Sequence, residues 1–172
     1  MHKEGDALLI QQPVYYPFRE VIEDNGRIFV NNQLHYEDGK YTIDFEDFEK
    51  KIVDNNVKVF ILCNPHNPVG RVWTKEELEK MGDICLKHNV VIMDDEIHCD
   101  FTYPGFKFTS FMTLDEKYHN SLVLYTSPSK TFNVADFSQP TLLLKIRNSA
   151  QHTVRQMQQQ VTAREALWDR LQ

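Results

Sequence analysis

Short apolar runs alternate along this chain with segments whose hydrophobic residues recur at helical spacing. Apolar runs occupy residues 7–10, 28–30, 57–63, 90–93 and 122–125. Runs of this length, several of them rich in β-branched residues, are typical of strands that are buried on both faces of a parallel sheet. The pattern therefore predicts five strands of a sheet that is covered by helices.

Three helices are predicted between these runs. The first spans residues 15–23, is entered through Pro13 and ends at Asn25 and Gly26. The second begins at the N-cap Asp44, and the third begins at a capping box of Thr74 and Glu77. Strands that alternate with helices at this spacing predict an α/β fold with a doubly wound, mainly parallel sheet.

Composition and charge narrow the classes of partner. The chain has 172 residues, 41% of them hydrophobic, which predicts one core rather than a fibrous or disordered protein. Its 19 basic and 25 acidic residues give a net charge of -6. The lysine and arginine residues form no cluster or stripe that could bind the phosphate backbone of a nucleic acid, so nucleic acid is not expected as a partner.

The cysteine content and the hydropathy of the chain indicate in which cellular compartment the protein is expected. Cys63, Cys85 and Cys99 are odd in number and lie in or beside apolar segments, which favours reduced thiols over disulfides. The first residues lack the apolar run of a signal peptide, and no later run approaches the roughly 18 apolar residues of a membrane span. We therefore expect a cytoplasmic protein with no membrane partner.

Polar clusters follow three of the predicted strands directly. They occupy residues 64–70, 94–98 and 127–133. Because the carboxyl ends of parallel strands form the ligand crevice of an α/β sheet, these clusters can converge on one small molecule. The second cluster could also suggest a metal site, but successive strand residues point in alternate directions and Cys99 adds no recognised ligand spacing.

The order and spacing of the three clusters resemble the class I/II aminotransferase group of pyridoxal-phosphate enzymes, of fold type I. The sequence Asp-Glu-Ile-His at residues 95–98 is most similar to the MalY- and PatB-like cystathionine β-lyase branch, because ordinary aminotransferases usually carry tyrosine at the position of His98. The resemblance covers residues 1 to about 135. It implies the incomplete large domain of a transferase that uses pyridoxal 5'-phosphate (PLP).

The resemblance implies roles for Lys130 and Asp95. Lys130 matches the lysine that forms a Schiff base with PLP and then moves the substrate's α-proton. Asp95 matches the aspartate that pairs with the pyridinium nitrogen and keeps the ring an electron sink. The alternative for Lys130 is a surface lysine in a turn.

Four further positions match cofactor-binding residues of the family. Asn67 matches the asparagine that binds the phenolic oxygen, Tyr15 the aromatic residue that stacks on the ring, and Ser127 a phosphate ligand. Tyr16 would replace Tyr15 if the register were shifted by one. Core packing for Tyr15 and helix capping for Ser127 are the competing roles. His98 would bind the cofactor edge, help to position the lysine, or serve as a structural histidine.

The character of the chain changes after residue 135. Residues 136–172 contain no glycine, and Asp136 and Phe137 stand where the family continues with glycine and leucine. We interpret residues 1–135 as a partial PLP-binding domain and residues 136–172 as a divergent tail. A single-base deletion after Ala135 would explain such a tail, while a native amphipathic helix over residues 149–171 is the alternative. The tail is expected to be helical at most.

The resemblance also implies what the intact family requires. A segment before residue 7 supplies a helix N-terminus for the cofactor phosphate, a C-terminal small domain supplies an arginine for the substrate carboxylate, and a partner subunit completes each site. We therefore expect a homodimer for the intact protein, but not for this chain.

Three functions remain open from the sequence. The favoured one is that the parent protein is a carbon-sulfur β-lyase, which converts cystathionine or another cysteine S-conjugate, a small amino-acid substrate, into a thiol, pyruvate and ammonia, and that this chain is an inactive fragment of it. The second is an aminotransferase, which would use the same proton abstraction. The third, for this chain, is a remnant without catalytic activity.

Overall fold

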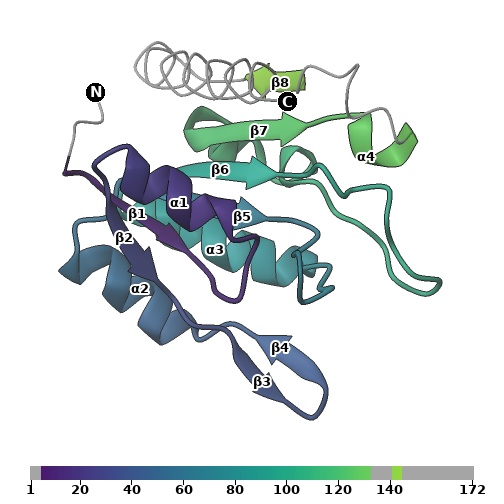
Figure 1. Ribbon diagram of the computed structural model, residues 1–172, viewed down its shortest axis with the longest axis horizontal. Helices are drawn as coiled ribbons and strands as arrows, with labels where there is room; N and C mark the ends of the chain where they lie inside the picture. Colours follow the sequence, from purple (N-terminus) through teal and green to yellow (C-terminus); the bar gives the residue numbers. More distant parts are fainter. Residues whose placement is uncertain (1–4, 133–140, 145–172) are drawn as a thin grey trace, which may run out of the picture.

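The central element of the computed structural model is a six-stranded sheet with the order β2-β1-β5-β6-β7-β8 (Figure 1). The structure describes residues 5–132 and 141–144, the latter as backbone. Strands β1 to β7 of this sheet run parallel, and β8 runs antiparallel to β7. The strands are β1 (Ala7–Ile10), β2 (Ile28–Asn31), β5 (Val59–Cys63), β6 (Val91–Asp95), β7 (Leu122–Thr126) and β8 (Thr141–Leu144).

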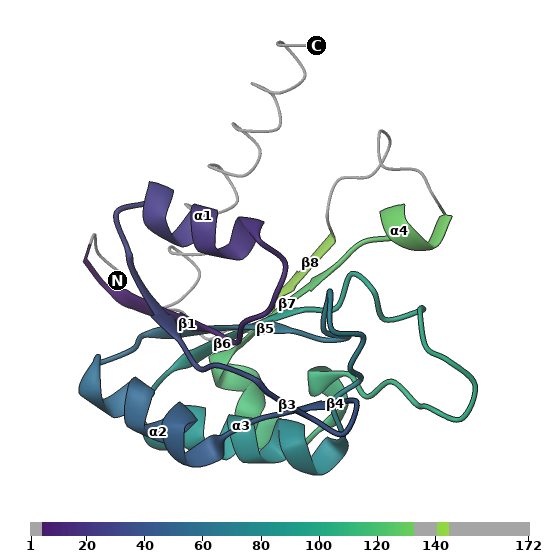
Figure 2. The same ribbon diagram turned by 60° about the horizontal axis from the view of Figure 1, so that its bottom comes forward.

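Helices cover both faces of this sheet, with α1 on one face and α2 and α3 on the other (Figure 2). The helices are α1 (Pro17–Asp24), α2 (Phe45–Asp54), α3 (Lys75–Lys87) and the short α4 (Ser129–Phe132). Two 3-10 helices, η1 (Phe111–Thr113) and η2 (Glu116–Ser121), precede β7. The predicted doubly wound, mainly parallel α/β fold is confirmed.

Local sequence signals explain where the elements begin and turn. The side chain of Asp44 accepts a hydrogen bond from the backbone of Asp47 at the start of α2, and both bonds of the capping box of Thr74 and Glu77 are present at α3. Helix α1 begins at Pro17, two residues later than predicted, because proline suits the first helical position, where its missing N–H is not needed.

A small hairpin projects from the sheet between β2 and α2. It consists of β3 (His35–Glu37) and β4 (Lys40–Thr42), which pair antiparallel. Asp38 and Gly39 between them have φ angles of 49° and 78°, the conformation that a tight hairpin turn requires. This turn joins two strands that the sequence pattern did not predict.

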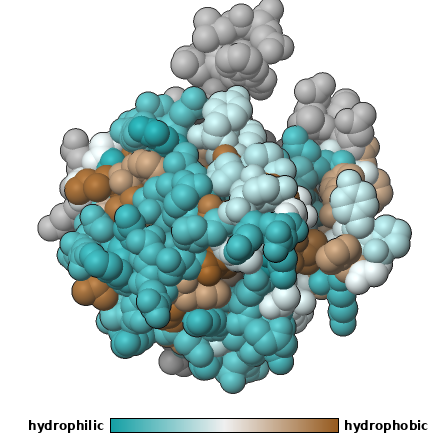
Figure 3. All heavy atoms as spheres, turned by 90° about the horizontal axis from the view of Figure 1, so that it is seen from below, coloured by the Kyte–Doolittle hydropathy of each residue, from teal (hydrophilic) through white to brown (hydrophobic). Residues whose placement is uncertain are grey.

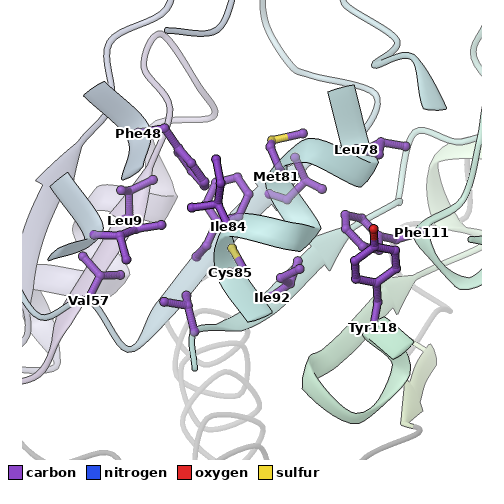
Figure 4. Packing of buried hydrophobic residues seen from close by; sticks show 14 of the residues in the cluster. Leu9, Phe48, Val57, Leu78, Met81, Ile84, Cys85, Ile92, Phe111 and Tyr118 are labelled. Carbon is purple, nitrogen blue, oxygen red and sulfur yellow. The ribbon is translucent and has the colours of Figure 1, made fainter. Parts of the chain in front are cut away.

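The core is divided by the sheet into two layers. Leu9 faces α2 and α3, where it packs in one cluster with Phe48, Ile84 and Cys85 (Figure 4). Leu8 and Ile10 face α1 and belong to a second cluster. Because side chains alternate along a strand, neighbouring residues at the strand ends also point to opposite faces.

The surface seen from below Figure 1 is largely hydrophilic, with hydrophobic areas that are separated from one another (Figure 3). No helix in the described part of the chain is long and apolar enough to cross a membrane.

Residues 141–144 form a strand, although the tail was expected to be helical at most. This expectation is wrong for these residues, because their backbone pairs antiparallel with the edge of β7 that faces away from β6. The deletion point after residue 135 and the candidate helix over residues 149–171 lie outside the described residues.

Candidate functional site

The carboxyl ends of β1 and β5 form a topological switch point. The chain leaves β1 towards β2 on one side and leaves β5 towards β6 on the other, although β1 and β5 are neighbours. Such a point is where open α/β sheets bind ligands, because the departing loops diverge and leave a crevice. The predicted residues of the site lie on the loops at this edge: Tyr15 after β1, Asn67 after β5, Asp95 at the end of β6, His98 after it, and Ser127 and Lys130 after β7.

Asp95 is a half-buried acid at this edge. It is in register with Cys63 of β5 and Tyr125 of β7. Burial raises the pKa of Asp95, whereas the Ile97 N–H, which donates to its Oδ1 at 3.1 Å, lowers it. A carboxyl group in this state becomes a stable anion when a cation is placed beside it.

The charge of Asp95 acts on several side chains at the same edge. Burial raises the pKa of Cys63 and of Tyr125 to about 12 each, and Asp95 adds to both shifts. The pKa of Tyr15 is raised by burial, then by Tyr16, and then by Asp95. Asp95 and Tyr15, which are distant in sequence, are therefore close in the fold.

Tyr15 presents a partly free aromatic ring. The residue is 44% exposed, compared with 72% for Tyr16. The edge of its ring contacts Phe18 with 5.8 Å between centroids, which fixes its orientation relative to α1. Tyr15 is therefore held by packing but keeps surface available for a flat ligand.

Internal contacts fix the loop that carries Asn67. The backbone N–H of Asn67 donates to the sulfur of Cys63 at 3.4 Å, and the Trp73 indole N–H donates to the Cys63 carbonyl at 3.0 Å. His66 is 2% exposed, and its Nε2 lies 3.0 Å from the carbonyl of Pro13. His66 therefore links the Asn67 loop to the segment that carries Tyr15.

Arg71 holds the far end of the same loop. Its guanidinium makes two hydrogen bonds to Glu77, both 2.7 Å long, and also donates to the Tyr41 carbonyl. Its Cζ lies 4.7 Å from the ring centroid of Trp73. Sequence reasoning assigned no role to His66, Arg71 or Trp73, because an isolated histidine, arginine or tryptophan carries no spacing signal.

Ser127 and Lys130 lie at the start of α4. Ser127 is 7% exposed, and its Oγ both donates to Ser129 Oγ at 2.9 Å and accepts from the Ser129 N–H at 3.2 Å. The hydroxyl thus already has the capping role that competes with phosphate binding. Lys130 is exposed and forms no hydrogen bond or ion pair with another residue in the described part of the chain.

His98 follows β6 and lies beside the acid. Its positive charge, when protonated, favours the ionised form of Asp95. Its ring is edge-on to Phe101, with 6.0 Å between centroids. Within residues 5–132 and 141–144, no three metal-binding side chains gather at this edge or elsewhere.

Comparison with known proteins gives consistent matches. The family model for aminotransferase class I and II matches residues 1–167. This range extends past residue 135, where the resemblance was expected to end. The origin of the tail stays a hypothesis.

Three similar proteins carry informative names. Cystathionine β-lyase PatB from Bacillus subtilis is 46% identical over 143 residues, which are 83% of this chain and 37% of PatB. The crystal structure of cystalysin from Treponema denticola, which contains a PLP cofactor, has a TM-score of 0.83 and 41% identity, covering 91% of this chain and 38% of cystalysin. The PLP-bound C-S lyase from Staphylococcus hominis has a TM-score of 0.79 and 34% identity, covering 85% and 37%. The chain thus spans well under half of the length of these proteins.

Proposed function

The chain belongs to the aminotransferase class I and II family, and from this membership we propose that it is part of a PLP-dependent carbon-sulfur β-lyase. The substrate is cystathionine or a related cysteine S-conjugate, and the products are a thiol, pyruvate and ammonia. Support comes from the identity of 46% with PatB and from the likeness to the C-S lyase structure.

The observation that carries the proposal is the half-buried acid Asp95, at the end of β6 beside the switch point. Partial burial raises the pKa of this carboxyl group, and a protonated pyridine nitrogen would supply a cation beside it. The half-exposed ring of Tyr15, which lies near Asp95, offers a face for stacking. These two side chains fit PLP, which supplies an electron-accepting ring that stabilises negative charge at the substrate α-carbon.

The remaining residues would bind the cofactor and move the proton. Asn67 would donate to the phenolic oxygen, and Ser127 and the start of α4 would bind the phosphate. The amine of Lys130 would accept the α-proton as the α C–H bond breaks. When the bond from Cβ to sulfur breaks, the thiolate leaves, and the resulting aminoacrylate hydrolyses to pyruvate and ammonia. The charge of His98 would lower the pKa of Asp95 and so favour its anion.

Chemical trapping tests the role of Lys130 directly. The chain is mixed with PLP, reduced with borohydride and digested, and the modified lysine is located by mass spectrometry. We expect the label to be concentrated on Lys130 and to disappear in Lys130→Ala. Lys50→Ala, which removes an exposed lysine of α2, should leave the labelling of Lys130 unchanged. Equal labelling of many surface lysines would contradict the proposal.

An aminotransferase is the second candidate, because the family model is named for this activity. The two candidates differ in their need for a keto acid. A β-lyase forms pyruvate from cystathionine without one, whereas an aminotransferase does not. Assays use the complete protein that contains this sequence, for which we propose a homodimer in the cytoplasm.

A further inference from the structure

A pair of acids, Asp94 and Glu96, lies on the face of the sheet opposite to Asp95. Asp94 is in register with Leu62 of β5, a member of the core layer that packs against α2 and α3. Glu96 lies just after the end of β6, on the same side as Asp94, because its Oε1 is bonded to the backbone of Phe111, a member of the same core layer. Asp94 is 0% exposed and Glu96 is 4% exposed, so both carboxyl groups are removed from water.

Asp94 lacks a hydrogen-bond donor. Neither of its carboxylate oxygens has a partner in the part of the chain that the structure describes, and the same is true of Asn64 Oδ1. After burial, Glu96 raises the pKa of Asp94 further, whereas the nearby Asn64 side chain lowers it. A buried carboxylate without donors is costly, whereas a protonated carboxyl group is neutral and carries a donor of its own.

Glu96, by contrast, is placed as the anion of the pair. Its Oε1 accepts a hydrogen bond from the Phe111 N–H at 3.0 Å. Burial raises the pKa of Glu96, but Asp94, Ser110 and Phe111 act in the opposite direction. Burial likewise raises the pKa of Asp94 well above its ordinary value, and the charge of Glu96 adds to this shift.

The surroundings supply no compensating positive charge. The other titratable groups that act on the pair are Asp95 from β6, on both acids, and Cys99 from the following loop, which interacts with Glu96. The loop after β5 contributes the neutral amide of Asn64, and segment 109–111 contributes the hydroxyl of Ser110. No lysine or arginine among the described residues is a cause of either shift, so two negative charges would repel each other here.

We propose that Asp94 and Glu96 share one proton at neutral pH, with the proton on Asp94 and the charge on Glu96, and that this pair positions Asp95. Glu96 holds the Phe111 backbone, and Asn64 donates to the Thr109 carbonyl at 3.1 Å. Segment 97–108 is therefore fixed where it returns to the sheet. At the start of this segment, the Ile97 N–H donates to Asp95. The contacts of Glu96 and Asn64 that fix the segment therefore also fix the position of Asp95. This inference concerns the chain itself and does not require cofactor.

The pH dependence of unfolding tests the shared proton. In the unfolded chain Asp94 is ionised above about pH 4, so the folded chain binds one proton more at neutral pH. Between about pH 4 and the raised pKa of Asp94, each unit by which the pH rises should increase the unfolding constant of the wild type about tenfold more than that of Asp94→Asn. Asp54→Asn, at an exposed aspartate of α2, should retain the wild-type dependence. Equal pH dependence in wild type and Asp94→Asn would overturn the proposal.

Infrared spectroscopy locates the proton without relying on unfolding. The folded wild type should show the carbonyl band of a protonated carboxyl group at neutral pH, and Asp94→Asn should lack it. Glu96→Gln should keep it, because the proton is on Asp94. A band that is absent from the wild type, or that only Glu96→Gln removes, would refute the assignment.

Amide exchange tests the positioning. When Asp94 loses its proton at alkaline pH, the wild type should lose protection at the amides of Ile97 and Phe111. Asp94→Asn should keep it when both proteins are compared at the same pH. Identical exchange profiles for wild type and variant would show that the pair does not hold the segment.

Discussion

Two adjacent aspartates at the end of β6 have different surroundings because a strand sends successive side chains to opposite faces. Asp95 faces α1 and the switch point, where its charge reaches Tyr15. Asp94 faces the layer of α2 and α3 and is fully buried. Strand β6 thus provides Asp95 to the candidate site and Asp94 to the buried pair of acids on the opposite face of the sheet.

Replacing Asp95 by asparagine tests its proposed pairing with PLP. The variant keeps the shape of the side chain but loses the anion, so a charged hydrogen bond of roughly 1.5–3 kcal/mol would be lost. The PLP concentration for half-maximal trapping on Lys130 should therefore rise about tenfold or more. Asp115→Asn, at the N-cap of η2, serves as the control. An unchanged PLP concentration in Asp95→Asn would contradict the pairing.

Individual residues of the site differed in how well sequence could predict them. Asp95 and Asn67 stand at the ends of apolar runs, so their placement at the sheet edge followed from the strand pattern. The shared burial of Asp94, Glu96 and Asn64 did not, because it depends on how segment 109–111 returns to the sheet. Contacts between residues that are distant in sequence leave no periodic signal.

At the scale of elements, α3 packs closely on η1 and η2 through a glycine. A Cβ atom at Gly82 would lie 2.6 Å from Cε1 of Tyr118 and 3.0 Å from Cζ of Phe111. These two rings meet edge to face with 5.5 Å between centroids, and both are fully buried. The helix therefore needs the smallest side chain at this position.

Gly82→Ala should destabilise the chain, although alanine is the better helix former by about 1 kcal/mol. Overpacking against two buried rings costs about 1–3 kcal/mol, so we expect a net loss of about 1 kcal/mol in the free energy of unfolding. Urea unfolding measures this loss. In a Tyr118→Leu background the same change should become stabilising, because the smaller side chain leaves room for the methyl group. Stabilisation by Gly82→Ala alone would show that the rings move aside at little cost.

Helix boundaries followed from the sequence where a cap was present. Asp44 and Thr74 begin α2 and α3 as predicted, because an N-cap acts through residues three positions away. The hairpin of β3 and β4 was missed because its short strands are largely exposed and carry no apolar run. Strand β8 was missed because its partner β7 precedes it by many residues, so its pairing is not a local property.

At the scale of the whole molecule, two buried groups in different layers limit the pH range of stability. As pH rises above about 4, the unfolded chain releases the proton of Asp94 while the folded chain keeps it, so the fold loses stability until the raised pKa of Asp94 is reached. His66 acts at the acid side, where burial lowers its pKa to about 4. Between about pH 4 and 6.5 the two dependences have opposite signs and offset each other, and above pH 6.5 the stability should fall as pH rises towards the raised pKa of Asp94.

The stability of the fold at acidic pH should depend on the protonation of His66. Its pKa is about 6.5 in an unfolded chain and about 4 in the fold, so the unfolded state binds the proton more tightly. The stability that neutral His66 contributes is complete above pH 6.5 and decreases as pH falls towards 4, by about 3 kcal/mol in total. His66→Gln removes this titration while keeping a donor near Pro13. Between pH 6.5 and 4, urea unfolding of the wild type should therefore lose about 3 kcal/mol more than the variant.

His35→Gln provides the matched control, because His35 is exposed on β3 and should leave the acid dependence unchanged. If His66→Gln and the wild type lose stability in parallel, protonation of His66 does not couple to unfolding, and its link between the Asn67 loop and Pro13 opens without disturbing the sheet. If they diverge as expected, the link is part of the cooperative structure. The two loops that carry Tyr15 and Asn67 then hold their relative position for as long as the whole molecule remains folded.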